Sequence, residues 1–352
     1  MSQLRTTVIR AGLEALYRTG AHHLLRPIFA GVGAIFMLHH VRPRRDAEFQ
    51  PNRHLEIDPS FLGKMLMHLR ARDVDIITMD ELHHRLDARD FSRRFACFTL
   101  DDGYRDNRDH ALPVLREFDA PCIVYAVSDF AAGTGRLWWV ALERVVAAAA
   151  TIEVEMHGRV ARMQTKTPAQ KQDAFDLLHD WLRALPNEHD VNREMSALCT
   201  RHGVDESAIA SELCMSWDEL KSFAADPLVT IGAHTITHSN LAKQSEESAL
   251  RELATGRADI EAAIGRKVEH LAYPYGDKIA AGPREFALAR TAGFKTAVTT
   301  RPGMTYAGSA AHLTALQRVS LNGHFQDERI LPVLTSGSAT ALWNGFRLVD
   351  AD

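Results

Sequence analysis

The chain has 352 residues, of which 46% are hydrophobic and 24% are charged, as is ordinary for a globular protein. The net charge of −4 and the absence of a basic run leave no electrostatic footprint for nucleic acid, so we expect no nucleic-acid partner. The length suits one large α/β domain with an insertion, or two smaller domains. Four cysteines without a CxxC spacing predict buried, reduced thiols and therefore a reducing compartment.

The first 33 residues alternate apolar residues with arginines, and we predict an amphipathic helical segment over residues 1–33. No stretch approaches the roughly 20 apolar residues of a membrane span, and no signal-peptide pattern is clear. The favoured interpretation is a helix packed on the body of the protein, and the alternative is a helix lying on an anionic membrane surface. We therefore expect a cytoplasmic protein, with peripheral contact to the inner membrane through this helix as the alternative.

From residue 33 onward, short apolar runs alternate with segments of helical spacing. Helical patterns occupy residues 61–72, 80–86, 107–118, 245–264 and 283–292. Buried strands are predicted at residues 33–38, 74–78, 95–100, 121–127, 227–232, 268–273, 294–299 and 316–321. Repeated units of this kind predict a parallel α/β barrel or a doubly wound sheet, and about eight strands favour closure into a barrel.

Residues 131–217 interrupt this rhythm with an Ala-rich helix, an alternating hairpin over 152–164 and three further helical stretches. We predict an inserted, mostly helical subdomain at 131–217, which divides the catalytic barrel into residues 34–130 and 218–326. Residues 327–352 form a C-terminal segment. Two interpretations of Trp138 and Trp139 stay open, because they could line a sugar-binding cleft or serve as ordinary core aromatics.

Histidines and carboxylates gather after the predicted strands. The run 95–100 is followed by Asp101 and Asp102, and others are followed by His39-His40, by His234 and His238, by Tyr275 and by His324. Because the carboxyl ends of parallel strands meet at one face, we expect these side chains to cluster there.

Such a cluster has the composition of a metal site. Two histidines four residues apart and one aspartate supply two nitrogens and one oxygen for a divalent metal, and three protein ligands leave positions open for water and substrate. One aspartate would bind the metal, and the other would stay free to accept a proton from water. We expect His39 and His40 to pack or hydrogen-bond near this site, and we assign neither as a ligand.

Three motifs then carry a resemblance to a known family. Residues 99–104 (Thr-Leu-Asp-Asp-Gly-Tyr), 234–238 (His-Thr-Ile-Thr-His) and 272–276 (Ala-Tyr-Pro-Tyr-Gly) occur in the order and spacing of the polysaccharide deacetylase family, also called carbohydrate esterase family 4 or the NodB homology domain. The chain resembles this family from about residue 35 to 325, apart from the insertion. The resemblance implies a distorted (β/α) barrel of about seven or eight strands.

The resemblance also implies roles for individual residues. Asp101 would be the general base, and Thr235 would brace the loop of the second motif. Tyr275 would offer its backbone N–H to the oxyanion. The metal, most commonly zinc or another divalent transition metal, would be held by Asp102, His234 and His238.

The chain departs from the family pattern at several positions. Leu100 stands where many members have Phe, and the fourth motif, an acid with a tryptophan, is not recognisable. Ala272 stands where the third motif commonly carries an Arg that pairs with the base, and we expect Arg318 to replace that cation. His324 follows Leu321 by three residues and not by the usual two, and we expect it to be the general acid.

The resemblance implies a hydrolase that removes N-acetyl groups from amino sugars and releases acetate. The expected cytoplasmic location points to a nucleotide-linked or lipid-linked glycan precursor as the substrate. Three alternatives stay open: an O-acetyl esterase or deformylase acting on a sugar, a non-catalytic glycan-binding module, and a membrane-associated scaffold. We make no prediction of the oligomeric state.

Overall fold

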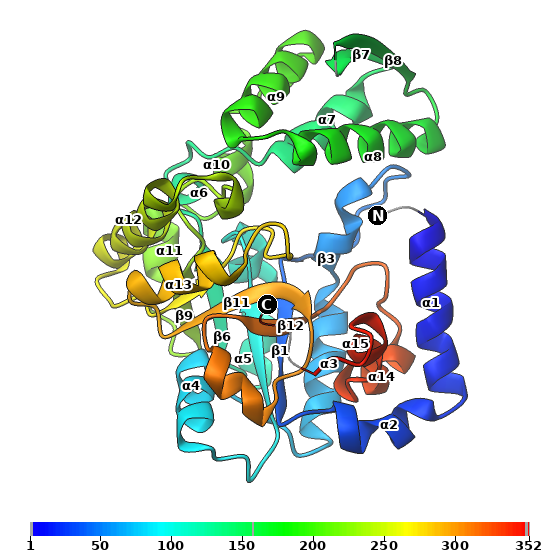
Figure 1. Cartoon of the computed structure of the whole chain (residues 1–352). Coiled ribbons are helices and arrows are strands. Elements are labelled where there is room, and N and C mark those ends of the chain that lie inside the picture. Colours follow the sequence, from blue (N-terminus) through cyan, green and yellow to red (C-terminus); the bar gives the residue numbers. More distant parts are fainter. Residues whose placement is uncertain (1–2, 157, 349–350, 352) are drawn as a thin grey trace.

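A closed ring of seven parallel strands forms the centre of the molecule (Figure 1). The computed structural model describes residues 3–156, 158–348 and 351. The ring runs in the order β1 (Gly33–Leu38), β12 (Leu316–Ser320), β11 (Thr296–Pro302), β10 (His270–Ala272), β9 (Val229–Ala233), β6 (Cys122–Ala126) and β5 (Phe95–Leu100), which pairs back to β1. The short β4 (Asp75–Ile76) pairs with β5 outside the ring. The predicted α/β barrel is therefore confirmed.

The strands are apolar on both faces because each face packs against a different layer. Phe36 and Phe98 belong to the larger core, which contains side chains of the surrounding helices. The alternate residues Ile35, Cys97 and Tyr125 belong to a second cluster shared with other strands of the ring. The period of two along a strand thus divides its side chains between two cores. All four cysteines are buried and free, as predicted.

Helices cover the outside of the ring. They are α3 (Pro59–Arg70), α4 (Met79–Ala88), α5 (Leu112–Glu117), α11 (Trp217–Phe223), α12 (Glu246–Ile264) and α13 (Pro283–Thr291). The continuous helix predicted over 107–118 is wrong in detail, because its first part is a π-helical turn, η2 (Asn107–Ala111). Pro113 lies in the first turn of α5, where its missing N–H removes one bond of an α-helical ladder.

Short elements lie in the segments that join the strands and helices. They are β2 (His40–Val41), η1 (Pro51–Leu55), β3 (Glu56–Ile57), η3 (Leu241–Lys243), η4 (Ala307–His312) and η5 (Glu328–Ile330). Two N-terminal helices, α1 (Gln3–Arg18) and α2 (Ala21–Phe29), lie beside α14 (Leu331–Thr335) and α15 (Ser338–Trp343) (Figure 1). Leu13 and Leu16 of α1 are buried in the larger core, which agrees with a helix packed on the body. Among the described residues, no helix is long and apolar enough to cross a membrane.

The inserted segment has a core of its own at one end of the barrel, drawn in green in Figure 1. It contains α7 (Trp138–Ala148), the hairpin β7 (Thr151–Met156) and β8 (Arg159–Gln164), α8 (Pro168–Ala184), α9 (Glu188–His202) and α10 (Ile209–Leu213), and it follows the short α6 (Ser128–Ala131). Trp138 and Trp139 are both buried in this core, which favours the interpretation as core aromatics. The exact domain boundaries stay a prediction.

Candidate active site

Three buried side chains converge at the carboxyl ends of two strands of the barrel. Asp102 follows β5, and His234 and His238 follow β9. The Nε2 atoms of His234 and His238 lie 3.5 Å and 3.3 Å from Asp102 Oδ1. One ligand atom from each residue lies within 4.8 Å of the other two. The three residues therefore meet in the structure, as the sequence predicted.

The donor atoms are oriented as a metal site requires. His234 Nδ1 lies 2.7 Å from the carbonyl oxygen of Ala272, which can only accept, so Nδ1 carries the proton and Nε2 presents its lone pair to Asp102. Asp102 Oδ1 is buried without a hydrogen-bond partner among the described residues. A buried oxygen of this kind is costly unless a cation or donor meets it. The three residues therefore fit a divalent metal.

The charges of these groups shift one another's protonation. Burial alone would raise the pKa of the Asp102 carboxyl, but the adjacent His234 and His238 hold that pKa well below its ordinary range. Burial alone would lower the pKa of His234, but Asp102 and Asp101 raise it above the ordinary value. Asp102 and His234 thus favour each other's charged forms in the absence of a bound cation.

Asp101, next to Asp102, has a different environment. Arg318 Nη1 donates to Asp101 Oδ1 at 2.8 Å, and Nη2 donates to Oδ2 at 2.7 Å. Burial alone would raise the pKa of Asp101, but the Arg318 guanidinium holds it below its usual value. His39 Nε2 lies 3.8 Å from Asp101 Oδ2. Burial lowers the pKa of His39, and Asp101 partly offsets this effect.

The backbone is strained at the same residues. Among the described residues, eight non-glycine positions have positive φ, and four of them are Asp102 (φ 73°), Thr235 (φ 68°), His238 (φ 59°) and Tyr275 (φ 61°). A β-branched residue such as Thr235 is rarely found in this region. Strain of this kind persists only where the surrounding structure holds it, and it concentrates at functional sites.

Glu252 of α12 holds the loop that carries the two histidines. Its carboxylate accepts hydrogen bonds from the backbone N–H groups of Ile236 and Thr237, at 2.9 Å and 3.0 Å. Thr235 Oγ1 accepts from the N–H of His238 at 3.0 Å, within the same loop. Gly256 lets α12 approach closely, because a Cβ there would lie 2.7 Å from the carbonyl carbon of Thr235.

The inserted segment contacts the loop of the third motif. Trp138 Nε1 donates to the Tyr275 hydroxyl at 2.9 Å. The guanidinium of Arg183, on α8, lies 4.5 Å from the centre of the Tyr275 ring and donates to Asp277 at 2.7 Å. The ring of Trp139 lies 5.0 Å from that of His238. The insertion therefore covers part of the carboxyl-terminal face of the barrel.

Comparisons with known proteins agree with this geometry. A family model described as polysaccharide deacetylase matches residues 197–297, which contain His234, His238 and Tyr275. The segment that carries the second and third motifs is therefore similar to polysaccharide deacetylases. No curated protein matches the sequence.

Three solved structures share the fold. The Streptococcus pyogenes deacetylase PplD in complex with acetate is 14% identical, with a TM-score of 0.55, over 82% of this chain and 92% of that one. BC0361, a polysaccharide deacetylase from Bacillus cereus, is 16% identical, with a TM-score of 0.51, over 82% and 65% of the two chains. IcaB from Ammonifex degensii is 19% identical, with a TM-score of 0.50, over 82% and 91%.

The structure brings together Asp101, Arg318 and the three expected metal ligands. For His324, Arg10 donates to its backbone carbonyl oxygen at 3.1 Å, and its ring lies 6.4 Å from that of His54. The role of His324 as the general acid stays a prediction, and its contacts in the structure are with residues outside the expected metal ligands.

Sequence reasoning missed one residue of the site, Glu252. His39 was expected to pack or hydrogen-bond near the site, and the structure places its Nε2 atom 3.8 Å from Asp101 Oδ2. A histidine directly after a buried strand was the available signal, but His40 beside it offered the same signal, and it instead bonds to Asp106 at 2.6 Å. Glu252 had no signal in the sequence, because an acid on a charged helix is ordinarily solvated.

Proposed function

We propose that this protein is a metal-dependent hydrolase that removes N-acetyl groups from the amino sugars of a glycan or glycolipid precursor. The observation that supports this most directly is the buried Asp101, paired with Arg318 beside the open set of Asp102, His234 and His238. A carboxylate next to a three-ligand metal set is the arrangement that amide hydrolysis by water needs.

In the proposed mechanism, Asp102, His234 and His238 hold a divalent metal, and two nitrogens with one oxygen suit zinc or another transition metal. When bound there, such a metal supplies Lewis acidity. Asp101, whose carboxylate is kept ionised by Arg318, accepts a proton from the attacking water. The backbone N–H of Tyr275 donates to the developing oxyanion.

The departing amine must receive a proton, and two histidines are candidates. We propose that His39 donates it, because its Nε2 atom lies 3.8 Å from Asp101 Oδ2 and its side chain is 18% exposed. A donor must lie within hydrogen-bond reach of the leaving group, or one water away. The ring of His324, the donor predicted from the sequence, lies 6.4 Å from that of His54.

Metal content and acetate release test the proposal together. The purified protein should contain about one divalent metal per chain, and His238→Ala should lose both the metal and acetate release from N-acetylated oligosaccharides. Arg159→Gln, at an exposed position on β8, is the control and should change neither. A metal-loaded wild type that releases no acetate from any N-acetylated sugar would favour a non-catalytic glycan-binding module. Release from O-acetylated or N-formylated sugars alone would favour an esterase or a deformylase.

We also propose that the protein acts in the cytoplasm and touches the membrane surface. The observation that supports membrane contact is apolar exposure on α2, where Leu24 is 80% and Ile28 is 62% exposed, beside exposed Trp343 and Phe346. Exposed arginines, Arg26 and Arg347, accompany them. Flotation with vesicles containing 30% anionic lipid should recover the wild type, and the double variant Leu24→Gln/Ile28→Gln should stay at the bottom of the gradient.

A further inference from the structure

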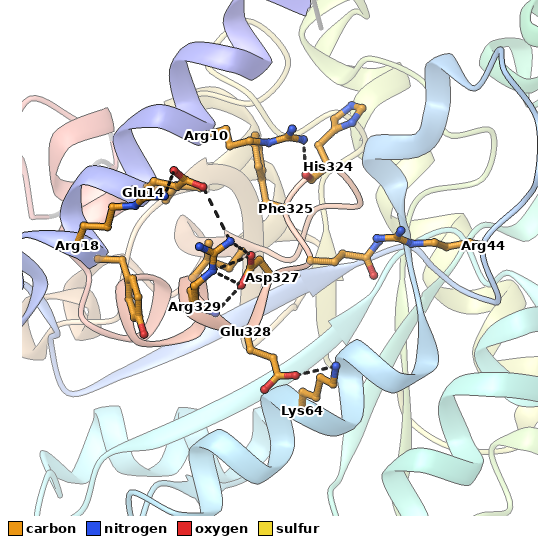
Figure 2. Close-up of a pocket in the computed structure, with 14 residues that line it drawn as sticks. Arg10, Glu14, Arg18, Arg44, Lys64, His324, Phe325, Asp327, Glu328 and Arg329 are labelled. Carbon is orange, nitrogen blue, oxygen red and sulfur yellow. Dashed lines mark hydrogen bonds and ion pairs between the residues drawn. The ribbon is translucent and has the colours of Figure 1, made fainter.

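A cavity lined by charged residues lies away from the expected metal ligands (Figure 2). It has a volume of about 650 Å³ and is bounded by α1, by Arg44 after β2, by Lys64 of α3 and by residues 324–330. Its lining includes three acids and five cations. The acids are Glu14, Asp327 and Glu328, and the cations are Arg10, Arg18, Arg44, Lys64 and Arg329.

Three of the five cations are occupied by these acids. Lys64 pairs with Glu328 at 2.8 Å, and Arg329 pairs with Asp327. Arg18 pairs with Glu14 at 3.3 Å. The dashed lines of Figure 2 show these pairs, and they leave Arg10 and Arg44 without an acid.

The two remaining arginines are available to a ligand. Arg10 donates through one nitrogen to the carbonyl oxygen of His324 at 3.1 Å, and this bond leaves its positive charge uncompensated. Within the described part of the chain, Arg44 has no carboxylate partner. Figure 2 shows its side chain extending toward the loop that carries His324 and Phe325. An arginine cluster with spare charge in a concave site attracts anions.

A neighbouring cavity of about 350 Å³ shares Arg44 and Gln326 and adds Arg53. Glu56, buried on the wall of this cavity, accepts a hydrogen bond from Arg42 at 2.7 Å. It also accepts hydrogen bonds from two nitrogens of Arg45. Asp58 accepts from the N–H of Ser60 at the start of α3, and Asp46 adds one exposed carboxylate. The side chain of Arg53, half-buried, has no carboxylate partner among the described residues.

A row of histidines joins this region to the expected active site. The His54 ring lies 6.4 Å from the His324 ring, nearly parallel to it, and His324 lines the larger cavity. Burial, together with the nearby His39 and His324, lowers the pKa of His54 to about 3. His39 in turn lies beside Asp101. The charges of His39 and His324 both act on His54, and a substrate bound beside His39 would reach the arginines in this direction.

We propose that Arg10, Arg44 and Arg53 bind the phosphate or diphosphate group of a sugar substrate whose acetylated unit lies at Asp101. This inference rests on the proposed function and specifies its substrate class. Guanidinium groups bind phosphate through paired charge-assisted hydrogen bonds, and a volume of several hundred Å³ accommodates a diphosphate with part of its substituent. A neutral glycan would leave these charges without a partner. A nucleoside diphosphate sugar and a lipid diphosphate sugar share this chemistry.

Calorimetric titration of the metal-loaded protein with inorganic pyrophosphate at low ionic strength tests the site. Arg44→Gln/Arg53→Gln should weaken binding by at least about tenfold, because each charge-assisted bond is worth about that factor. Arg44→Lys/Arg53→Lys should retain part of the affinity, and Arg159→Gln should bind like the wild type. The inference is overturned if Arg44→Gln/Arg53→Gln binds pyrophosphate as tightly as the wild type does.

Two further arms separate this inference from the proposed function and from binding at the metal. His238→Ala should lose acetate release and metal but keep pyrophosphate binding; loss of pyrophosphate binding in this variant alone would place the anion on the metal and overturn the inference. If His238→Ala still releases acetate, the proposed function fails while the arginine site stands. Tighter binding of uridine diphosphate than of pyrophosphate indicates a nucleotide-linked sugar, and tighter binding of farnesyl diphosphate indicates a lipid-linked one.

Discussion

Arg318 donates two parallel hydrogen bonds to Asp101, one to each carboxylate oxygen, with the arginine side chain fully buried. The same guanidinium donates to Thr99 Oγ1 at 3.0 Å and to the carbonyl oxygen of Thr299 at 2.8 Å. Removing two charges from water is costly, and only bidentate geometry with further hydrogen bonds offsets that cost. The pair therefore depends on β5, β11 and β12 meeting inside one ring.

Breaking this pair should cost stability as well as activity. Arg318→Met leaves a buried carboxylate without its cation, and we expect it to lower the free energy of unfolding by about 3–5 kcal/mol. Urea denaturation at pH 7 measures the loss. Adding Asp101→Asn to Arg318→Met removes the stranded charge and should recover part of the stability, but no acetate release. Equal stability of Arg318→Met and the wild type would contradict the role of the pair.

The adjacent aspartates should respond differently to the same substitution. Asp101→Asn should abolish acetate release while the metal content stays near that of the wild type, because the three donor atoms are untouched. Asp102→Asn should lose both, since it removes the anionic oxygen that lies 3.3 Å and 3.5 Å from the histidine nitrogens. Elemental analysis of the two purified variants makes the comparison. Loss of metal from Asp101→Asn would place this aspartate among the ligands.

The two candidate proton donors can be separated by paired substitutions. His39→Gln should lower kcat for acetate release by about 10²–10⁴-fold, the range typical of a lost general acid, with the metal retained. His324→Gln should have a much smaller effect on a neutral N-acetylated oligosaccharide. Steady-state kinetics with metal analysis of both variants decides between them. A large loss in His324→Gln with a near-normal His39→Gln would restore the donor predicted from the sequence.

Glu252 should influence the metal without touching it. Its carboxylate holds the backbone of Ile236 and Thr237 between the two histidines. Glu252→Gln keeps the size but replaces one acceptor oxygen with a donor, so we expect metal affinity to fall by about 10–100-fold, as for other residues that orient ligands. Competition with a chelating dye measures the affinity. Glu247→Gln, in the exposed first turn of the same helix, is the control and should leave it unchanged.

The half-buried His54 should make the protein less stable in acid. Its pKa is lowered to about 3, whereas an unfolded histidine titrates near 6.5. Between these values the unfolded chain binds a proton that the folded chain does not, so this contribution to stability is complete above pH 6.5 and is lost as the pH falls. At pH 5 the loss is about 2 kcal/mol. Urea midpoints at pH 7 and pH 5 should differ less in His54→Gln than in the wild type. An unchanged difference would contradict the prediction.

The sequence by itself determined the barrel and most of its active site. Apolar runs such as residues 95–100 had to be strands covered on both faces, and polar residues directly after them had to share one face. His234, His238 and one of the two aspartates could therefore be expected to meet, and the resemblance to a known family assigned Asp102 to this group. The resemblance also called for a cation beside Asp101, and Arg318 on the last strand was the candidate for it.

Only the tertiary structure decided which histidine stands beside Asp101, and what the other charged groups do. His39, His40 and His324 all follow strands, yet the His39 side chain lies beside Asp101, that of His40 bonds to Asp106, and the His324 ring lies 6.4 Å from that of His54. Glu252 contacts its loop only because Gly256 lets two backbones approach. Sequence patterns report burial and period, whereas the direction of a single side chain depends on contacts between segments far apart in the chain.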